Sequence, residues 1–476
     1  MIGRVLAYGV MFFVPIVNTR ALTQEDYGYY KQFHLIFETL APLLMLGFPM
    51  SLQYYLPRAR TAREKSTYVT QTLTFLITGS IVAMALYTVL GHVLGAGMGL
   101  MIRSFYWRLC AFTGLMMVSH YMEWLFAAEK EFGKQSLFHM LFAVLQSLVV
   151  IVSAWYYRSV SGIIWVLTVF AAFRCIYSLA YTVRRYRPSF RLISLATIKE
   201  QLSFALPVGL FGIVLMLVSQ TDKFIITRFM GREAFAVYVV GAFQIPMVNM
   251  ISMSVRNVTF PLMAQHHEAG DFREIADIWR RTAVKTSILY FPLFAFLEAT
   301  APFVVTVLFT DNYAGATPIF MIYMLLLVQL ATDSVAIIQV FKRTNYLLRV
   351  FTVAFVANLG LSVFLYRLVG REGVPLATII TLFTTNLVNI VFASRLCGVG
   401  FFRFVPLVPL ASRFLIAVIP GGILWWGCRR FAIDSFWELA LVGVVYFATY
   451  FAICRAAGFV TLSDIRSLFG RGQPVA

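Results

Sequence analysis

TRALTQEDYGYY at residues 19–30 recurs in altered form as TRFMGREAFAVY at residues 227–238. The Thr-Arg pair, a glutamate and the final tyrosine keep their positions in both copies, and each copy follows a hydrophobic run long enough to cross a bilayer. The pattern therefore indicates a parallel internal repeat. Because repeats of this kind place a substrate path between two homologous lobes, it favours a transporter.

The composition indicates a membrane protein. Of 476 residues, 60% are apolar and 13% are charged, with a mean hydropathy of +0.80. A globule of this length would have too little polar surface to be solvated. The hydrophobic runs are close to 20 residues long and contain Gly and Pro, whereas barrel strands would alternate in segments of about ten residues. The predicted fold class is an all-α polytopic membrane protein.

About 14 runs are long enough for a transmembrane helix. Connections on the side of the N-terminus carry about twice as many Lys and Arg residues as those on the other side, which predicts that both termini are cytoplasmic. No connection is long enough to form a separate soluble domain. The expected spans lie near residues 2–18, 33–55, 68–91, 104–127, 136–156, 160–183, 201–229, 234–260, 284–309, 315–341, 347–366, 374–394, 405–427 and 436–456.

The net charge of +18 does not indicate a nucleic-acid partner. The cations are spread over many short loops beside the spans, where anionic lipid headgroups explain them. The five cysteines are scattered without metal-ligand spacing, so we expect neither a metal site nor a disulfide framework.

The longest internal connection, residues 261–285, has an amphipathic pattern. Asp271 followed by Glu274 is typical of a helix start. We therefore expect a short amphipathic helix on the cytoplasmic surface. Four residues share one face of it at spacings of three and four: Phe272, Ile275, Trp279 and Thr282.

Several local patterns resemble one family. RALTQEDYGYY at residues 20–30 resembles the stretch after the first helix of polysaccharide flippases, members of the multidrug, oligosaccharidyl-lipid and polysaccharide exporter superfamily. LGFP at 46–49 with YLPR at 55–58 is similar to their second helix, and residues 206–223 are similar to their seventh. Residues 301–313 also fit. The resemblance covers about residues 1–395, and the last two helices look like an addition. Ala236 replaces Gly28 in the second motif copy, so the repeat is asymmetric.

The resemblance implies two six-helix lobes, residues 1–190 and 191–400, around a central cavity, with two further helices and a cytoplasmic tail in residues 401–476. It also implies a substrate, a polyprenyl-diphosphate-linked oligosaccharide, which alternating access would move from the cytoplasmic to the periplasmic leaflet of the inner membrane for cell-surface polysaccharides such as O-antigen. Membrane lipids and other polysaccharide-assembly membrane proteins are the implied partners. Sugar hydroxyls and phosphates cost several kcal/mol each in hydrocarbon, so a polar, cationic lining is required.

Two polar stripes could supply this lining or could make interhelical contacts. One consists of Asn249, Ser252, Arg256 and Thr259, and the other of Thr378, Thr381, Thr385 and Asn389. Arg256 is the first candidate for the diphosphate, because a guanidinium binds phosphate oxygens bidentately. It could instead extend to the lipid headgroups. Arg174 and Lys223 are further candidates for the substrate or for interhelical ion pairs.

Four acids lie within hydrophobic runs, where a charged carboxylate must be paired, protonated or hydrated. Each could bind a coupling H⁺ or Na⁺ or could form a structural salt bridge. No other cofactor or metal is expected. The acids are Glu38, Asp222, Asp333 and Glu298.

Two other functions remain open. An ion-coupled multidrug exporter of the same superfamily would carry hydrophobic cations and would favour an acidic cavity. A membrane glycosyltransferase or polymerase would also span the membrane many times, but such enzymes place catalytic residues on a large outer loop or soluble domain. Since every outer connection here is short and no catalytic set is evident, we expect that the chain is not an enzyme.

Overall fold

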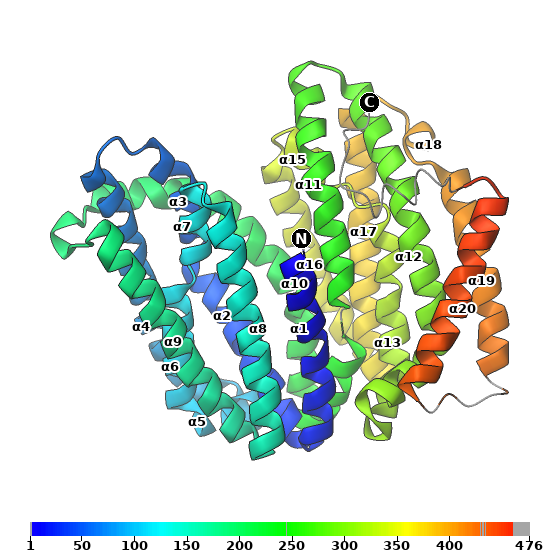
Figure 1. Cartoon of the computed structure of the whole chain (residues 1–476), viewed down its shortest axis with the longest axis horizontal. Helices are drawn as coiled ribbons and strands as arrows, with labels where there is room; N and C mark the ends of the chain where they lie inside the picture. Colours follow the sequence, from blue (N-terminus) through cyan, green and yellow to red (C-terminus); the bar gives the residue numbers. More distant parts are fainter. Residues whose placement is uncertain (1, 244, 429, 431–432, 434, 460–476) are drawn as a thin grey trace. The chain divides into compact units, whose positions relative to one another are not determined.

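The computed structural model describes residues 2–243, 245–428, 430, 433 and 435–459 (Figure 1). All regular elements in these residues are helical, which confirms the predicted fold class of an all-α polytopic membrane protein. The chain divides into two compact units. Unit 1 comprises Met1–Ile251 and Arg343–Thr381, and unit 2 comprises Ser252–Lys342 and Leu382–Ala476. The lobe boundaries near residues 190 and 400 stay a prediction.

The helices of the first part of unit 1 overlap the predicted spans but differ from several of their boundaries. They are α1 (Ile2–Ala21), α2 (Gln24–Met45), α3 (Ser51–Tyr55), α4 (Ala62–Val93), α5 (Leu100–Ser104), α6 (Tyr106–Ser119), α7 (Met122–Ala128), α8 (Phe132–Tyr157), α9 (Val160–Tyr186) and α10 (Leu195–Gly241), with 3₁₀ turns η1 (Phe48–Met50) and η2 (Leu56–Arg58) on either side of α3. Unit 1 also contains α16 (Thr344–Val369).

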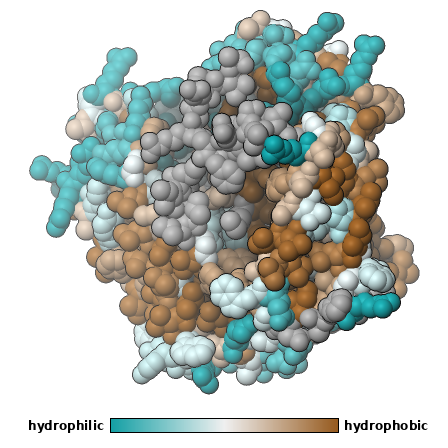
Figure 2. Space-filling view, turned by 45° about the vertical axis from the view of Figure 1, so that its right-hand side comes forward, coloured by the Kyte–Doolittle hydropathy of each residue, from teal (hydrophilic) through white to brown (hydrophobic). Residues whose placement is uncertain are grey.

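Two helices contribute residues to both units, α11 (Pro246–Glu268) and α17 (Gly373–Leu396). Unit 2 is otherwise built from α12 (Phe272–Phe309), α13 (Thr317–Met324), α14 (Leu326–Leu330), α15 (Val335–Val340), α18 (Phe401–Phe404), α19 (Leu407–Cys428) and α20 (Phe436–Ala456). Figure 2 shows a face of the molecule on which hydrophobic side chains form a broad central zone between more hydrophilic margins, as expected for a surface in contact with lipid.

The count of 14 spans is not confirmed. Among the described residues, nine helical segments are long and apolar enough to cross a membrane, or up to ten if one bent pair is a single span. That pair lies in the predicted span 33–55, where α2 and the helical turns of Phe48–Arg58 meet at 54°. The bend follows from left-handed backbone at Leu46 and Gly47, with φ of 48° and 70°. The expected span 234–260 is divided between the end of α10 and α11, and the span 315–341 is divided into the short helices α13, α14 and α15.

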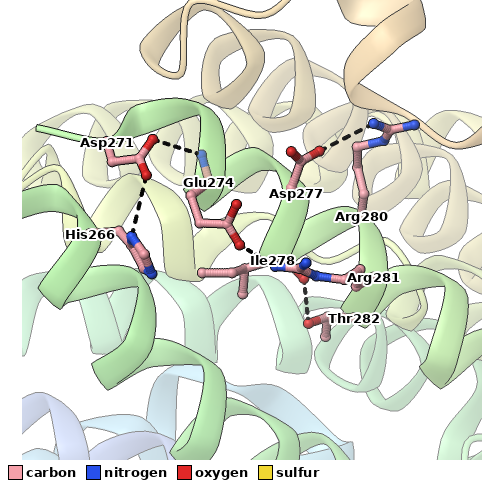
Figure 3. A network of polar contacts seen from close by, with 8 residues as sticks. All are labelled: His266, Asp271, Glu274, Asp277, Ile278, Arg280, Arg281 and Thr282. Atoms are coloured by element: carbon pink, nitrogen blue, oxygen red, sulfur yellow. Dashed lines mark hydrogen bonds and ion pairs between the residues drawn. The ribbon is translucent and has the colours of Figure 1, made fainter. Parts of the chain in front are cut away.

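The connection between α11 and α12 differs from the prediction. Asp271 caps the helix by accepting a hydrogen bond from the Glu274 backbone N–H at 3.3 Å (Figure 3), so the predicted helix start is correct. The amphipathic segment is not a separate helix, however, because α12 continues without a break from Phe272 to Phe309. Within its first turns the Glu274 carboxylate pairs with Arg281, and Asp277 lies 3.2 Å from Arg280. These pairs stabilise a helix start that runs directly into the long apolar segment.

The two copies of the repeated motif contact each other within unit 1. The Arg232 guanidinium lies 2.5 Å from the Glu25 carboxylate and 4.4 Å from the centre of the Tyr29 ring. A Cβ on Gly28 would lie 2.5 Å from the Arg232 carbonyl oxygen, so glycine is required for this approach. The segment around residues 25–29 therefore packs directly on the equivalent turn in α10.

The same two helices also pack closely at the other end of α2. A Cβ on Gly209 of α10 would lie 2.3 Å from the Leu46 carbonyl oxygen. Beyond the bend, the Gln201 side chain donates a hydrogen bond to the Ser51 hydroxyl at 3.0 Å. Since α2 and α10 touch at both ends, the polar side chains between them are held at a helix interface.

The added C-terminal helices pack on α12 in unit 2. A Cβ on Gly421 of α19 would meet the Ala295 side chain at 3.1 Å, which shows how closely α19 approaches α12. In α20 the Tyr446 hydroxyl donates a hydrogen bond to the Ala417 carbonyl at 2.9 Å. These helices therefore belong to the packed body of unit 2.

Candidate substrate cavity

A polar cavity of about 160 Å³ lies in unit 2 between α11, α12 and the segment that leads into α15. Four residues singled out in the sequence lie on its wall: Ser252, Arg256, Thr259 and Asp333. The first three share one face of α11 because their spacing matches the helical period, as predicted. Trp279, Thr282, Thr286 and Tyr290 line the cavity from α12.

Hydrogen bonds fix most of the polar groups around this cavity. Tyr290 and Ser252 join α12 to α11 through their hydroxyls at 2.6 Å. The Trp279 indole N–H donates to the Asp333 carbonyl at 2.8 Å. The Arg256 guanidinium donates to the side-chain oxygen of Gln339 on α15. The cavity wall is therefore assembled from residues that are distant in sequence.

Arg256 and Asp333 give the cavity its charge. Both side chains are exposed, Arg256 on α11 and Asp333 in the non-helical segment between α14 and α15. Gln339 is neutral, so its bond to Arg256 leaves the positive charge uncompensated at that contact. A guanidinium and a carboxylate on one small cavity can bind a ligand that carries an anion and hydroxyl groups.

A second group of charged residues lies between α2 and α10 in unit 1. The Lys223 ammonium donates to the Gln220 side-chain oxygen at 2.5 Å, and the Gln220 amide donates to the Glu38 carboxylate at 3.4 Å. Lys31 and His34 occupy the same face of α2 as Glu38, at spacings of three and four. His34 is only half-buried, but its Nε2 is buried and has no hydrogen-bond partner among the described residues.

Lys31 and His34 are not among the site residues predicted from the sequence. Lys31 lies outside the expected span 33–55. In the structure α2 begins at Gln24, and Thr23 caps it by accepting a hydrogen bond from the Asp26 N–H at 3.1 Å. The cap and the spacing of Lys31, His34 and Glu38 were present in the sequence and could have identified these residues.

Asp222 lies close to Lys223 in sequence but points elsewhere. It is buried, and its carboxylate accepts a hydrogen bond from the Tyr238 hydroxyl at 2.9 Å. Tyr238 ends the second motif copy and follows the non-helical Gly231 in α10. The bond therefore ties the two parts of α10 together, while ion coupling at Asp222 stays a prediction.

Arg174 lies in a packed interhelical site. Its guanidinium is 3.5 Å from the Glu123 carboxylate and 5.3 and 5.6 Å from the ring centres of Phe138 and Phe142. His139 Nδ1 is 3.1 Å from the other oxygen of Glu123. For Arg174 the sequence left open a contact with the substrate or an interhelical ion pair. The structure has the ion pair, and a contact with the substrate stays a prediction.

We expect the double variant Arg174→Met/Glu123→Leu to transport as well as the wild type. Arg174→Met alone should lower the apparent unfolding temperature, because it leaves a partly buried carboxylate with one partner fewer, at a cost of about 2 to 3 kcal/mol. Apparent unfolding temperature and transport rate should be measured for both variants. A double variant that is stable but inactive would show that Arg174 contacts the substrate.

The remaining threonines and asparagines are distributed between the units. In unit 1 the Asn358 amide donates to the hydroxyls of Thr378 and Thr381 at 3.3 and 3.5 Å, which is an interhelical contact between α16 and α17. Thr385 is buried in unit 2, and Asn249 is exposed in unit 1. A substrate role for Thr381, Thr385 and Asn249 stays a prediction.

Glu298 lies on α12 but not on the polar cavity. It is about 12 Å beyond Tyr290 along the helix and lines a separate, apolar cavity. Among the described residues, no group of three or more His, Cys, Asp or Glu side chains is arranged to hold a metal ion.

The fold is that of transporters of the MOP superfamily. The lipid II flippase MurJ in an inward closed conformation aligns over 95% of this chain and 99% of its own, with a TM-score of 0.74 and 14% identity. An inward-facing multidrug resistance MATE family transporter aligns over 82% and 94%, with a TM-score of 0.66 and 13% identity. A MOP superfamily transporter from Pyrococcus furiosus aligns over 83% and 94%, with a TM-score of 0.56 and 13% identity.

The sequence comparison identifies the family. A family described as polysaccharide biosynthesis protein matches residues 17–318, and the chain therefore belongs to it. A search of curated proteins found no match. The family and the fold confirm the resemblance drawn from the repeated motif.

Proposed function

We propose that this protein is a flippase that moves a polyprenyl-diphosphate-linked oligosaccharide from the cytoplasmic to the periplasmic leaflet of the inner membrane. The observation that carries the proposal is an exposed arginine, Arg256, on the wall of a polar cavity in a chain with many membrane-spanning helices. The family supports it, because its members are described as polysaccharide biosynthesis proteins.

The chemistry of the cavity suits a diphosphate with an attached sugar. The Arg256 guanidinium presents a planar set of donors that can bind two phosphate oxygens at once and stays charged at physiological pH. Ser252, Tyr290 and Thr259 offer hydroxyls that can exchange hydrogen bonds with a sugar. A polyprenyl tail would stay in the bilayer while only the headgroup moves through the protein.

The charged group in unit 1 contains two further cations that could bind an anion. Lys31 and Lys223 are both half-buried, and the Gln220 amide lies between Lys223 and Glu38. In this proposal Lys223 binds the substrate anion in one stage of the cycle. The secondary candidates for substrate binding are Arg174, Asn249, Thr381 and Thr385. Two of them, Arg174 and Thr381, already have protein partners.

Ion coupling is proposed at an exposed acid. Glu38 and Asp333 are exposed within the helical bundle and can exchange H⁺ or Na⁺ with a hydrated cavity. Asp222 is buried against Tyr238 and is a weaker candidate. Glu298 lies among apolar side chains, where it could take up a proton. In the proposed topology both termini are cytoplasmic, and other polysaccharide-assembly proteins in the same membrane deliver and remove the substrate.

The second candidate function is ion-coupled export of hydrophobic cations. The exposed carboxylates of Glu38 and Asp333 favour it, because acids within a cavity attract cations. The two functions differ in the charge of the substrate. The polar cavity carries the Arg256 guanidinium as well as the Asp333 carboxylate, and the guanidinium favours the diphosphate.

The test uses purified full-length protein in liposomes that contain a fluorescent polyprenyl-diphosphate oligosaccharide. We expect the protein to make the labelled sugar of one leaflet accessible from the other side, at a rate at least about tenfold above that of empty liposomes. Liposomes with a cationic dye serve as the comparison. Transport of the dye without the glycolipid would reject the proposed function in favour of the multidrug alternative.

A deletion strain provides an independent test. Loss of the protein should cause lipid-linked oligosaccharide to accumulate on the cytoplasmic leaflet and should remove the surface polysaccharide. Normal surface polysaccharide in the deletion strain, with no suppressor and no second copy of the gene, would contradict the proposal.

A further inference from the structure

An apolar cavity of about 560 Å³ lies in unit 2, apart from the polar cavity. It is lined by α12, by α13 and the following Leu325, and by α19, one of the two last helices, and it is open to the surface. Its wall is apolar and aromatic with one exception. The lining includes Phe294, Glu298, Met321, Phe414, Gly422 and Trp425.

The cavity exists because small residues face each other across α12 and α19. Gly421 packs against Ala295, which brings the two helix backbones close together. The adjacent Gly422 lines the cavity, and a Cβ there would meet no atom within 4 Å. A larger side chain at Gly422 would therefore enter open space rather than displace a neighbour.

Glu298 is the one ionisable side chain in this lining. It has no hydrogen bond or ion pair with any other described residue, although it is only half-buried. It lies about 16 Å from the end of α12 at Phe309, which is close to the midplane of a hydrocarbon core about 30 Å thick. An unpaired carboxylate at this depth is unfavourable unless a proton or a ligand neutralises it.

We propose that this cavity is a binding site for a lipophilic organic cation, with Glu298 as the counter-charge. Phe294, Phe414 and Trp425 supply apolar area, and their ring faces attract a cation. A lipophilic cation partitions into the membrane and can reach the cavity beside Trp425, whose side chain is exposed. The carboxylate would then gain a partner without contact with water.

The position and charge of Glu298 exclude two other occupants. The amine headgroup of a lipid stays at the membrane surface, too far from a carboxylate near the midplane. The diphosphate of the proposed substrate would be repelled, since the lining contains no basic side chain. This site shares no lining residue with the polar cavity proposed for the diphosphate, so cation binding here and glycolipid flipping can each fail without the other.

Tetraphenylphosphonium and tetraphenylborate provide the test, because they have nearly the same shape and opposite charge. Binding of each ion to the full-length protein in lipid nanodiscs should be measured by equilibrium dialysis, with empty nanodiscs as the background. We expect saturable binding of the cation and at least about tenfold weaker binding of the anion. Glu298→Gln should weaken cation binding about tenfold and should remove most of the discrimination between the two ions.

Two glycines on α19 give a matched control for the location of the site. Gly422→Leu fills the cavity and should abolish saturable binding of the cation. Gly427→Leu makes the same change on the same helix, outside the cavity lining and with no atom within 4 Å of the added Cβ, and it should bind as the wild type does. Equal binding of both ions to the wild type, or unchanged cation binding in Glu298→Gln or in Gly422→Leu, would overturn the proposal.

Discussion

Arg256→Gln is expected to reduce the initial rate of glycolipid flipping in liposomes by about ten- to a hundredfold. Hydrogen bonds to charged groups contribute about 1.5 to 3 kcal/mol each, and the variant loses both the charge and the second donor that a diphosphate would use. Glutamine keeps one amide donor, so the cavity wall stays polar. The measurement is the flipping rate of the fluorescent substrate at equal protein density, together with the apparent unfolding temperature.

Arg256→Lys separates phosphate binding from contact with the membrane surface. A lysine side chain reaches the lipid headgroups as well as arginine does. Arg256→Lys should therefore be as active as the wild type if Arg256 only anchors α11 at the membrane interface. It should restore activity only in part if the residue binds the diphosphate bidentately, because an ammonium is a point charge.

Arg273→Gln is the matched control for the loss of one positive charge. Arg273 is exposed near the start of α12 and does not line the polar cavity. We expect Arg273→Gln to flip the substrate at a rate within about twofold of the wild type. This change is small compared with the loss of rate expected when a residue that binds the phosphate is replaced. Full rescue by lysine, or an equal loss in Arg273→Gln, would show that Arg256 does not bind the diphosphate.

The sequence identified one wall of the polar cavity but not the whole cavity. Ser252, Arg256 and Thr259 lie on one face of α11 because their spacing matches the period of the helix. This property is local and can be read from the sequence alone. Tyr290 and Gln339 contact these residues from α12 and α15, as the Ser252 and Arg256 hydrogen bonds show. Such contacts depend on tertiary packing, and a single sequence contains no direct signal for them.

The misplaced start of α2 has a different cause. Hydropathy locates the apolar centre of a helix, whereas Lys31 lies in a polar first part outside the expected span 33–55. The capping pattern at Thr23 is the better guide to where the helix begins. The error concealed Lys31, which shares a face with Glu38.

The amphipathic segment before α12 shows a limit of periodicity. Ile275 and Trp279 are buried, as their spacing predicted, and Trp279 stacks on Phe404 with ring centres 4.5 Å apart. The pattern is the same for a separate surface helix and for the first turns of a long one. Only the lack of a break between Phe272 and Phe309 distinguishes them, and it is observed in the coordinates.

Gly209→Ala is expected to cause the largest loss of stability of any single methyl addition in α10. The new Cβ would lie 2.3 Å from the Leu46 carbonyl oxygen and 2.9 Å from the Gly47 nitrogen. Both are backbone atoms at the bend after α2, where Gly47 already has a φ of 70°, so no side chain can rotate away. The clash can be relieved only if α2 and α10 move apart, which lowers the free energy of unfolding by about 1 to 3 kcal/mol or more.

Gly212→Ala on the same helix is the control, because a Cβ there would meet no atom within 4 Å. Glycine in a helix is about 1 kcal/mol less favourable than alanine, so this variant should be as stable as the wild type or more stable. The apparent unfolding temperature of the detergent-solubilised protein should therefore fall for Gly209→Ala and stay level or rise for Gly212→Ala. Equal temperatures for the two variants would contradict the close contact between the α2 bend and α10. The Gln220 bridge between Glu38 and Lys223 would then lose its support, since it depends on the same pair of helices.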